Sequence, residues 1–516
     1  MRKIYEVDSR LCTPARRATH TCAAHDEGTT RRVCCAPRVE PLNGAAQQTN
    51  AVIDDRTERL AEAVRSASVA AGASVYLGAG AGGWAWSGPE RPTLLLGPSR
   101  SGKTSSLVIP NVLAAPGAVV STSTKPDVLR ATAAARAHAG WTLLYDPGGT
   151  VDPPAGVIRV GWSPINAARQ WDGALAVADA MVSAAEHGSG EHSQTTHDGH
   201  WNERAGSLLA PLLHAAALDG VPMEKLLHWV DRHDGSDPLS VLSARVGQDA
   251  PPTDVLAGIL TTDGREQSGI WSTASGILRA YRSSGALAST EPPYFDADAF
   301  CRGAHTLYLC SSGRQQHLWA PLMVGLLSEV RDAAYRRARD GVVGAPVLLA
   351  LDEAANIAPI PDLPAMVSEG AGQGLLTLAS LQDLSQARRR WGRQGDAFLS
   401  LFGTTVVLPG IADVPTLQAI STLAGNEEVP TRTVGAGLGH DGRRRPSVSW
   451  STVQRPRLPP DVVGRGTSGT ALALDAANRI GWVRLTPAHA THPWRELVAA
   501  GRTRARHGPT PDARAR

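Results

Sequence analysis

The sequence predicts an α/β protein with an open, mostly parallel sheet and an all-helical segment inserted within it. Short apolar runs alternate with helical segments, and residues 163–300 carry helical spacing alone. The chain has 516 residues, of which 42% are hydrophobic and 19% charged, so it can bury a substantial core. Its formal charge of only +3 excludes a global polycation, so any nucleic-acid contact must come from locally placed arginines.

Nine apolar runs have the length and composition of strands. Several are apolar throughout, as expected for parallel strands that are covered on both faces. The predicted strands are 93–96, 118–122, 141–145, 157–160, 306–310, 347–351, 375–379, 404–408 and 481–485. The segment 426–457 is rich in Gly, Arg and Ser, and we expect a long loop there.

A phosphate-binding motif follows the first predicted strand. It consists of Gly97, Pro98, Ser99, Arg100, Ser101, Gly102, Lys103 and Thr104, with Ser105 next to it, and it matches G-x-x-x-x-G-K-[ST]. The glycines let backbone N–H groups turn towards a phosphate at the start of a helix. Lys103 has the reach for the β- and γ-phosphates, and the Thr104 hydroxyl is a ligand for Mg²⁺. The alternative is a chance glycine-rich turn.

Two carboxylates end the apolar run 347–351. Asp352 at a strand end is suited to hold Mg²⁺, and Glu353 is suited to activate a water molecule as general base. This pair favours hydrolysis over phosphoryl transfer to a small alcohol. The alternative is an aspartate that caps the following helix.

An amide follows the next predicted strand, 375–379. Gln382 is placed to orient water or to sense the γ-phosphate, and its alternative is an ordinary residue at a helix N-terminus. Lys125 and Asp127 follow the second predicted strand at its carboxyl end, where ligands bind in open α/β sheets. A surface turn started by Pro126 is the alternative for these two.

The ordered series of these motifs resembles one family. The quoted segments are 105–110, 121–127, 145–148, 161–165, 201–205, 351–353, 360–364, Gln382 and 455–461. Together they resemble the type IV coupling proteins, the TraG/TraD-type conjugative DNA-transfer ATPases, in an actinobacterial style. The resemblance extends over about residues 76–487.

The resemblance implies a RecA-like motor domain and an all-α domain that selects DNA or substrate. It also implies ATP and Mg²⁺ as cofactors, a homo-hexameric ring, and ATP-driven delivery of DNA from a relaxase–DNA complex to a type IV secretion channel. Two alternatives stay open: another hexameric ring translocase, acting in plasmid or chromosome partition, and an ATP-binding adaptor that docks substrate with little hydrolysis. The Asp352–Glu353 pair counts against the adaptor.

On this basis we divide the chain into five parts. These are a disordered leader (1–50), a RecA-like nucleotide-binding domain in two parts (51–162 and 301–500), an all-α inserted domain (163–300) and a basic mobile tail (501–516). Arginine clusters at 388–390, Arg393 and 443–445 are candidates for tracking a DNA backbone without sequence preference, or are solvated charged faces.

The sequence departs from the family pattern in two ways. No stretch reads as a transmembrane helix, so we expect a cytoplasmic protein. Either a partner anchors it at the inner face of the cell membrane, or the chain belongs to a soluble subgroup. The segment 368–374, just before the strand that precedes Gln382, lacks the basic residue that some relatives carry as an arginine finger. Arg265, Arg302 and Arg314 are the alternatives.

Overall fold

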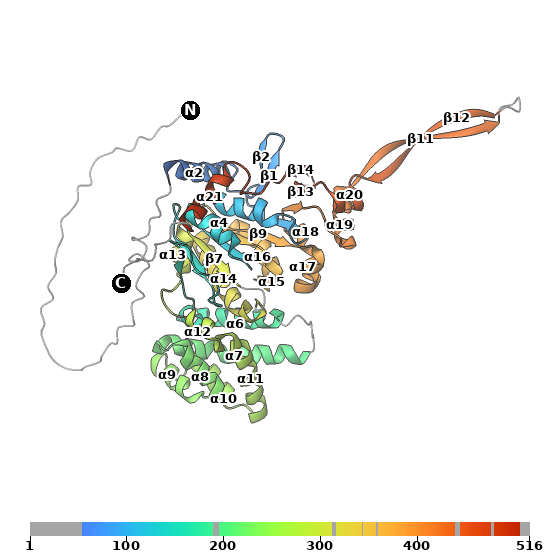
Figure 1. Ribbon diagram of the computed structural model, residues 1–516. Coiled ribbons are helices and arrows are strands. Elements are labelled where there is room, and N and C mark those ends of the chain that lie inside the picture. The colour runs from blue at the N-terminus through green and yellow to red at the C-terminus, as the bar shows by residue number, and fades with distance from the viewer. Residues whose placement is uncertain are drawn as a thin grey trace, which may run out of the picture. The chain divides into compact units, whose positions relative to one another are not determined.

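A computed structural model of the chain describes residues 54–188, 196–311, 316–342, 344–357, 360–438, 444–475 and 479–505 (Figure 1). The predicted leader lies outside these residues. Helix α21 (Trp494–Ala505) continues past the predicted start of the tail at residue 501, and residues 506–516 lie outside the described part. Among the described helices, none has the length and apolar character needed to cross a bilayer.

A twelve-stranded sheet organises the fold, in the order β2-β1-β14-β13-β10-β3-β9-β8-β4-β7-β5-β6. Eight neighbouring strands, from β10 to β6, are parallel. Their bounds are β3 Thr93–Leu96, β4 Val119–Ser123, β5 Thr142–Tyr145, β6 Ile158–Arg159, β7 Thr306–Cys310, β8 Val347–Leu351, β9 Leu375–Leu381 and β10 Thr404–Val407. The carboxyl ends of these strands therefore meet at one edge.

Four antiparallel strands extend the sheet beyond β10: β13 (Thr470–Asp475), β14 (Ile480–Arg484), β1 (Tyr76–Gly80) and β2 (Gly83–Trp86). The sequence patterns predicted only β14 among these. Glycines interrupt the pattern of β1 and β2, and small alanines weaken the apolar signal of β13.

Helices cover both faces of the parallel strands, and successive strand residues alternate between two cores. Leu95 and Leu348 lie in one core, while Leu94, Leu96 and Leu349 lie in the other. The first core contains α2 (Asp55–Ala70), η1 (Thr104–Val108), α3 (Ile109–Ala114), α4 (Asp127–Arg136) and α21. Burial on both faces explains why these strands are apolar throughout.

The second core joins the sheet to the helical insertion. The described residues between β6 and β7 form helices, and the inserted helices pack on α14 and on one another. Their bounds are α5 Pro164–Ala167, α6 Trp171–Gly188, α7 Thr196–Asp219, α8 Met223–Arg232, α9 Ser236–Arg245, α10 Pro251–Leu260, α11 Gly264–Ile277, η2 Leu278–Arg282, α12 Ser284–Ala288 and α13 Ala297–Arg302. Trp162 anchors the junction, since its Nε1 donates a 2.7 Å hydrogen bond to Glu329 Oε2 on α14.

The remaining helices follow β7 and complete the second face. They are α14 Gln316–Arg339, α15 Ala354–Ile357, α16 Leu363–Glu369, η3 Gly370–Gln373, α17 Leu384–Trp391, η4 Gly392–Ala397, α18 Phe398–Leu401, α19 Val414–Ala424 and α20 Pro460–Arg465.

The prediction of a long loop at 426–457 is wrong. The segment forms a two-stranded antiparallel hairpin, β11 (Asn426–Leu438) and β12 (Arg444–Pro456), labelled in Figure 1. The described side chains on both faces of this hairpin are almost all exposed, including Trp450 at 68%. Neither face is buried against a core, so the apolar alternation that identifies most strands is missing from the sequence.

Candidate nucleotide site

The phosphate-binding loop joins β3 to η1 at the carboxyl edge of the sheet. Its start is tightly packed: a Cβ at Gly97 would lie 2.8 Å from Leu408 Cβ and 2.9 Å from Ser101 Oγ. Its end requires an unusual backbone, because Gly102 has a φ of +96°. A side chain at either glycine would therefore strain the turn at the strand end.

Lys103 lies at the base of this loop. Its Nζ donates hydrogen bonds to the carbonyl oxygens of Gly97 and Pro98, the second at 2.9 Å. Burial lowers the pKa of Lys103, and the nearby carboxylates Asp352 and Glu353 oppose that shift. The loop thus holds a buried ammonium beside two carboxylates.

Asp352 faces the loop from the end of β8. The Thr104 hydroxyl donates a 2.6 Å hydrogen bond to Asp352 Oδ2, and the Thr122 hydroxyl donates a 3.2 Å bond to the Asp352 carbonyl. Desolvation raises the pKa of this buried carboxyl, while the Thr104 bond and Lys103 act in the opposite direction. A threonine hydroxyl and a carboxylate oxygen, both hard oxygen donors, are thereby held together.

Glu353 has a different environment from its neighbour. Its side chain is exposed, and its backbone φ of +55° turns the chain sharply between β8 and α15. Positive φ is uncommon for a non-glycine residue and is a feature of functional sites. The turn leaves Asp352 buried while the Glu353 side chain lines the same cavity.

Gln382 reaches the loop from a third strand. β9 pairs with both β3 and β8, so its end lies between the phosphate-binding loop and the acidic pair. Gln382 Nε2 donates a 3.3 Å hydrogen bond to Ser99 Oγ, and its backbone N–H donates a 2.8 Å bond to Gln386 Oε1.

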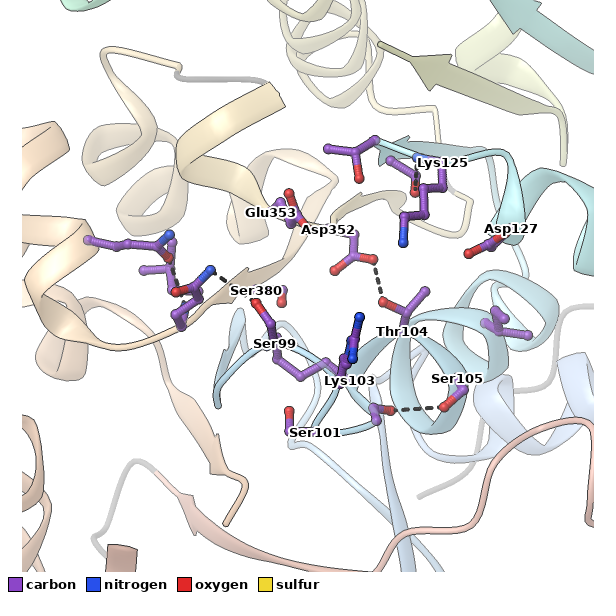
Figure 2. Close-up of a pocket in the computed structure, with 18 residues that line it drawn as sticks. Ser99, Ser101, Lys103, Thr104, Ser105, Lys125, Asp127, Asp352, Glu353 and Ser380 are labelled. Atoms are coloured by element: carbon purple, nitrogen blue, oxygen red, sulfur yellow. Dashed lines mark hydrogen bonds between the residues drawn. The ribbon is translucent and has the colours of Figure 1, made fainter. Parts of the chain in front are cut away.

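These residues line one cavity of about 450 Å³ (Figure 2). From the predicted set, the lining residues are Ser99, Arg100, Ser101, Gly102, Lys103, Thr104, Ser105, Asp352, Glu353 and Gln382. Gly97 and Pro98 form the loop behind that wall. The donor set fits a magnesium–phosphate group: a glycine turn at the start of helical structure, a buried ammonium and paired oxygen ligands.

Two residues whose placement the sequence left open also line this cavity, Lys125 and Asp127 in the connection from β4 to α4. β4 pairs with β8, which brings this connection beside the acidic pair. In the sequence, only their position after a predicted strand indicated that these two residues could bind a ligand. The order of the strands in the sheet places them in this cavity.

The predicted arginine clusters do not line the cavity in the described part of the chain. Arg388 on α17 instead pairs with Asp396 at 2.6 Å and lies 4.0 Å from Asp413. Arg314 and Arg443 lie outside the described residues.

Solved structures of a bacterial conjugative coupling protein, TrwB, have the same fold. The unbound form is 18% identical, with a TM-score of 0.58 over 77% of this chain and 85% of that one. A complex of TrwB with the ATP analogue ADPNP is 18% identical, with a TM-score of 0.58 over 85% and 93% of the two chains. A complex with ADP and Mg²⁺ has a TM-score of 0.56 at 18% identity, over 77% and 85%. This likeness identifies the α/β domain as RecA-like.

A search of curated protein sequences gave no significant match. The family model for type IV secretory system conjugative DNA transfer matches residues 43–468, which is most of the chain. That match spans the phosphate-binding loop, the helical insertion and the acidic pair in their observed order. The chain therefore belongs to the type IV secretory system conjugative DNA-transfer family.

Proposed function

We propose that this protein is a magnesium-dependent ATPase that couples hydrolysis to movement of DNA into a type IV secretion channel. The observation that carries the proposal is the single cavity lined by Lys103, Thr104, Asp352 and Glu353. Family membership supplies the link to conjugative DNA transfer. TrwB, which shares the fold, is described in complex with ADPNP and with ADP and Mg²⁺.

Nucleotide binding rests on the loop and its lysine. The backbone of residues 97–104 cradles the phosphates, and Lys103 neutralises their charge from the base of the cavity. Thr104 and Asp352 hold the metal ion. When bound, Mg²⁺ supplies charge neutralisation at the phosphate oxygens.

Hydrolysis then requires a base and an oriented water molecule. Glu353 accepts a proton from the water as the water oxygen bonds to the γ-phosphorus. The bond from the γ-phosphorus to the bridging oxygen breaks, and ADP keeps the electron pair. Gln382, hydrogen-bonded to Ser99 on the loop, orients the water or detects loss of the γ-phosphate.

Coupling to DNA requires an assembly. We infer a homo-hexameric ring that contacts DNA through its backbone without sequence preference, receives a relaxase–DNA complex and delivers it to channel proteins. The location that fits this role is the cytoplasmic face of the cell membrane, with an anchoring partner. Arg265, Arg302 and Arg314 are the candidates for an arginine that completes a neighbour's site.

The test is ATPase activity of the purified full chain with and without DNA, in single- and double-stranded form. We expect stimulation by DNA and loss of turnover in Lys103→Ala. Lys225→Ala is the matched control, because Lys225 lies on α8 in an ion pair with Asp237. Undiminished ATPase activity in Lys103→Ala contradicts the site.

A rate unaffected by DNA, together with tight nucleotide binding, contradicts the translocase and supports the docking adaptor. ATP-dependent displacement of a labelled third strand from duplex DNA measures movement directly. The Glu353→Gln protein is its control, since we expect that variant to bind nucleotide without hydrolysing it.

A further inference from the structure

We propose that Lys125 is a second phosphate-binding lysine, which contacts the γ-phosphate and makes the site distinguish ATP from ADP. The inference rests on the proposed function and deepens it, because it assigns a residue that discriminates between the two nucleotides.

The position of Lys125 is the first argument. It follows β4, whose partner β8 ends in the Asp352–Glu353 pair, so Lys125 lies on the wall of the cavity away from β3. Figure 2 shows its side chain pointing into the same space as Thr104 and Asp352. Lys103 approaches from the loop that follows β3. A phosphate chain running from that loop towards Glu353 would thus end near Lys125.

The choice of amino acid is the second argument. The chain contains 51 basic residues, but Lys3, Lys103, Lys125 and Lys225 are its only lysines. Two of these four line one cavity. In a chain that otherwise uses arginine for positive charge, a lysine at this place indicates a need for a compact ammonium. An ammonium acts on phosphate as a compact point charge, whereas a guanidinium is a wider planar fork, so arginine would reproduce the contact only in part.

The charge around the cavity is the third argument. Its lining has three positive side chains (Arg100, Lys103 and Lys125) and three negative ones (Asp127, Asp352 and Glu353). Without Lys125 the side chains of the lining would carry one more negative than positive charge, which disfavours the binding of a triphosphate. Asp352 and Glu353 stand side by side where the γ-phosphate must sit for hydrolysis, so a positive charge from Lys125 would favour the phosphate there.

The availability of the side chain is the fourth argument. Lys125 is exposed, and within the described residues no carboxylate forms an ion pair with its ammonium. Its backbone is held in place, because Lys125 N–H donates a 3.3 Å hydrogen bond to Ser123 Oγ at the end of β4. An anchored backbone and a free ammonium suit a group that binds a ligand.

The test compares wild type, Lys125→Ala, Lys125→Arg and the control Lys225→Ala. Calorimetry on the full chain gives the dissociation constants for Mg-ADP and for Mg-ADPNP, and a steady-state assay gives kcat. We expect Lys125→Ala to weaken Mg-ADPNP binding by about 10- to 100-fold, the range for a lost charged hydrogen bond, and Mg-ADP binding by less than about twofold. Lys125→Arg keeps the charge and should recover part of the preference, and Lys225→Ala should match wild type.

An unchanged ratio of the two affinities in Lys125→Ala overturns the inference. An equal loss of both affinities is one such result, and it would indicate damage to the fold of the cavity. The ratio needs no hydrolysis. A wild-type protein that binds both nucleotides but does not hydrolyse ATP therefore contradicts the proposed ATPase, while the ratio still decides the role of Lys125.

Discussion

The Thr104 hydroxyl donates a 2.6 Å hydrogen bond to the Asp352 carboxylate, although the two residues are 248 positions apart in the chain. Each follows a different parallel strand, and β9 lies between those strands in the sheet. The contact joins the loop that is suited to hold phosphates to the strand end that is suited to hold a metal ion. The contact therefore shows that the phosphate-binding loop and the carboxylate proposed to hold the metal ion meet in the fold, as the proposed site requires.

Removing the Thr104 hydroxyl should raise the magnesium requirement. Thr104→Val keeps the shape of the side chain but loses the oxygen, so we expect the Mg²⁺ concentration for half-maximal ATPase activity to rise about tenfold, or ~1.4 kcal/mol. Titration of Mg²⁺ at saturating ATP measures the change. Thr104→Ser keeps the hydroxyl and should remain close to wild type; equal requirements in the Val and Ser variants would contradict a metal-binding role.

Replacing the Glu353 carboxylate should separate binding from turnover. Glu353→Gln has nearly the same volume but cannot accept the proton, so kcat should fall by about 10²- to 10⁴-fold. Calorimetry should find the affinity for Mg-ADPNP within about threefold of wild type, because Glu353 is not among the proposed phosphate or metal ligands. A variant that retains kcat would show that another group activates the water.

Removing the hairpin should leave the RecA-like fold intact. Its described side chains are nearly all exposed, and Arg457 N–H donates a 2.9 Å hydrogen bond to the Gly425 carbonyl at its base. We expect a variant with residues 427–455 replaced by two glycines to keep its DNA-free ATPase rate and to unfold within about 3 °C of wild type. Thermal unfolding followed by circular dichroism checks this, and a large loss of stability would mean that the strands support the core.

The free energy of unfolding should decrease in mild acid, because His305 becomes protonated more readily in the unfolded chain than in the folded protein. Its Nδ1 accepts a 2.9 Å hydrogen bond from Trp141 N–H, its ring stacks on Trp141, and burial, with Arg136 nearby, lowers its pKa to about 4. Because the folded pKa lies below the ordinary value of 6.5, this contribution is complete above about pH 6.5 and is lost as the pH falls towards about 4.

The measurement is the free energy of unfolding in urea for wild type and His305→Asn, at about pH 7 and about pH 4.5. Asn offers an acceptor to Trp141 but does not titrate. Carboxylates titrate in both proteins, so the comparison isolates His305. Wild type should lose more stability than the variant over this interval, and equal losses would refute the assignment.

The sequence predicted correctly those segments whose structure depends on residues nearby in the chain. Parallel strands that are buried on both faces consist of apolar residues throughout and are therefore visible in the sequence as apolar runs. For this reason β3, β7 and β8 were predicted with their observed bounds. The phosphate-binding loop was predictable because Gly97 and Gly102 meet local constraints of packing and backbone angle. The hairpin was not predicted, since the described side chains of β11 and β12 bury no face and the two strands are held together mainly by backbone pairing.

The α/β class, the helical insertion, the glycine turn and the acidic strand end could be predicted without a structure, because each depends on residues close together in the chain. The folded arrangement was needed to show that β9 lies between β3 and β8, that Gln382 contacts Ser99, and that Lys125 lines the same cavity as Lys103. The order of parallel strands is set by the packing of distant helices and crossover connections, and no local pattern of residues encodes that order.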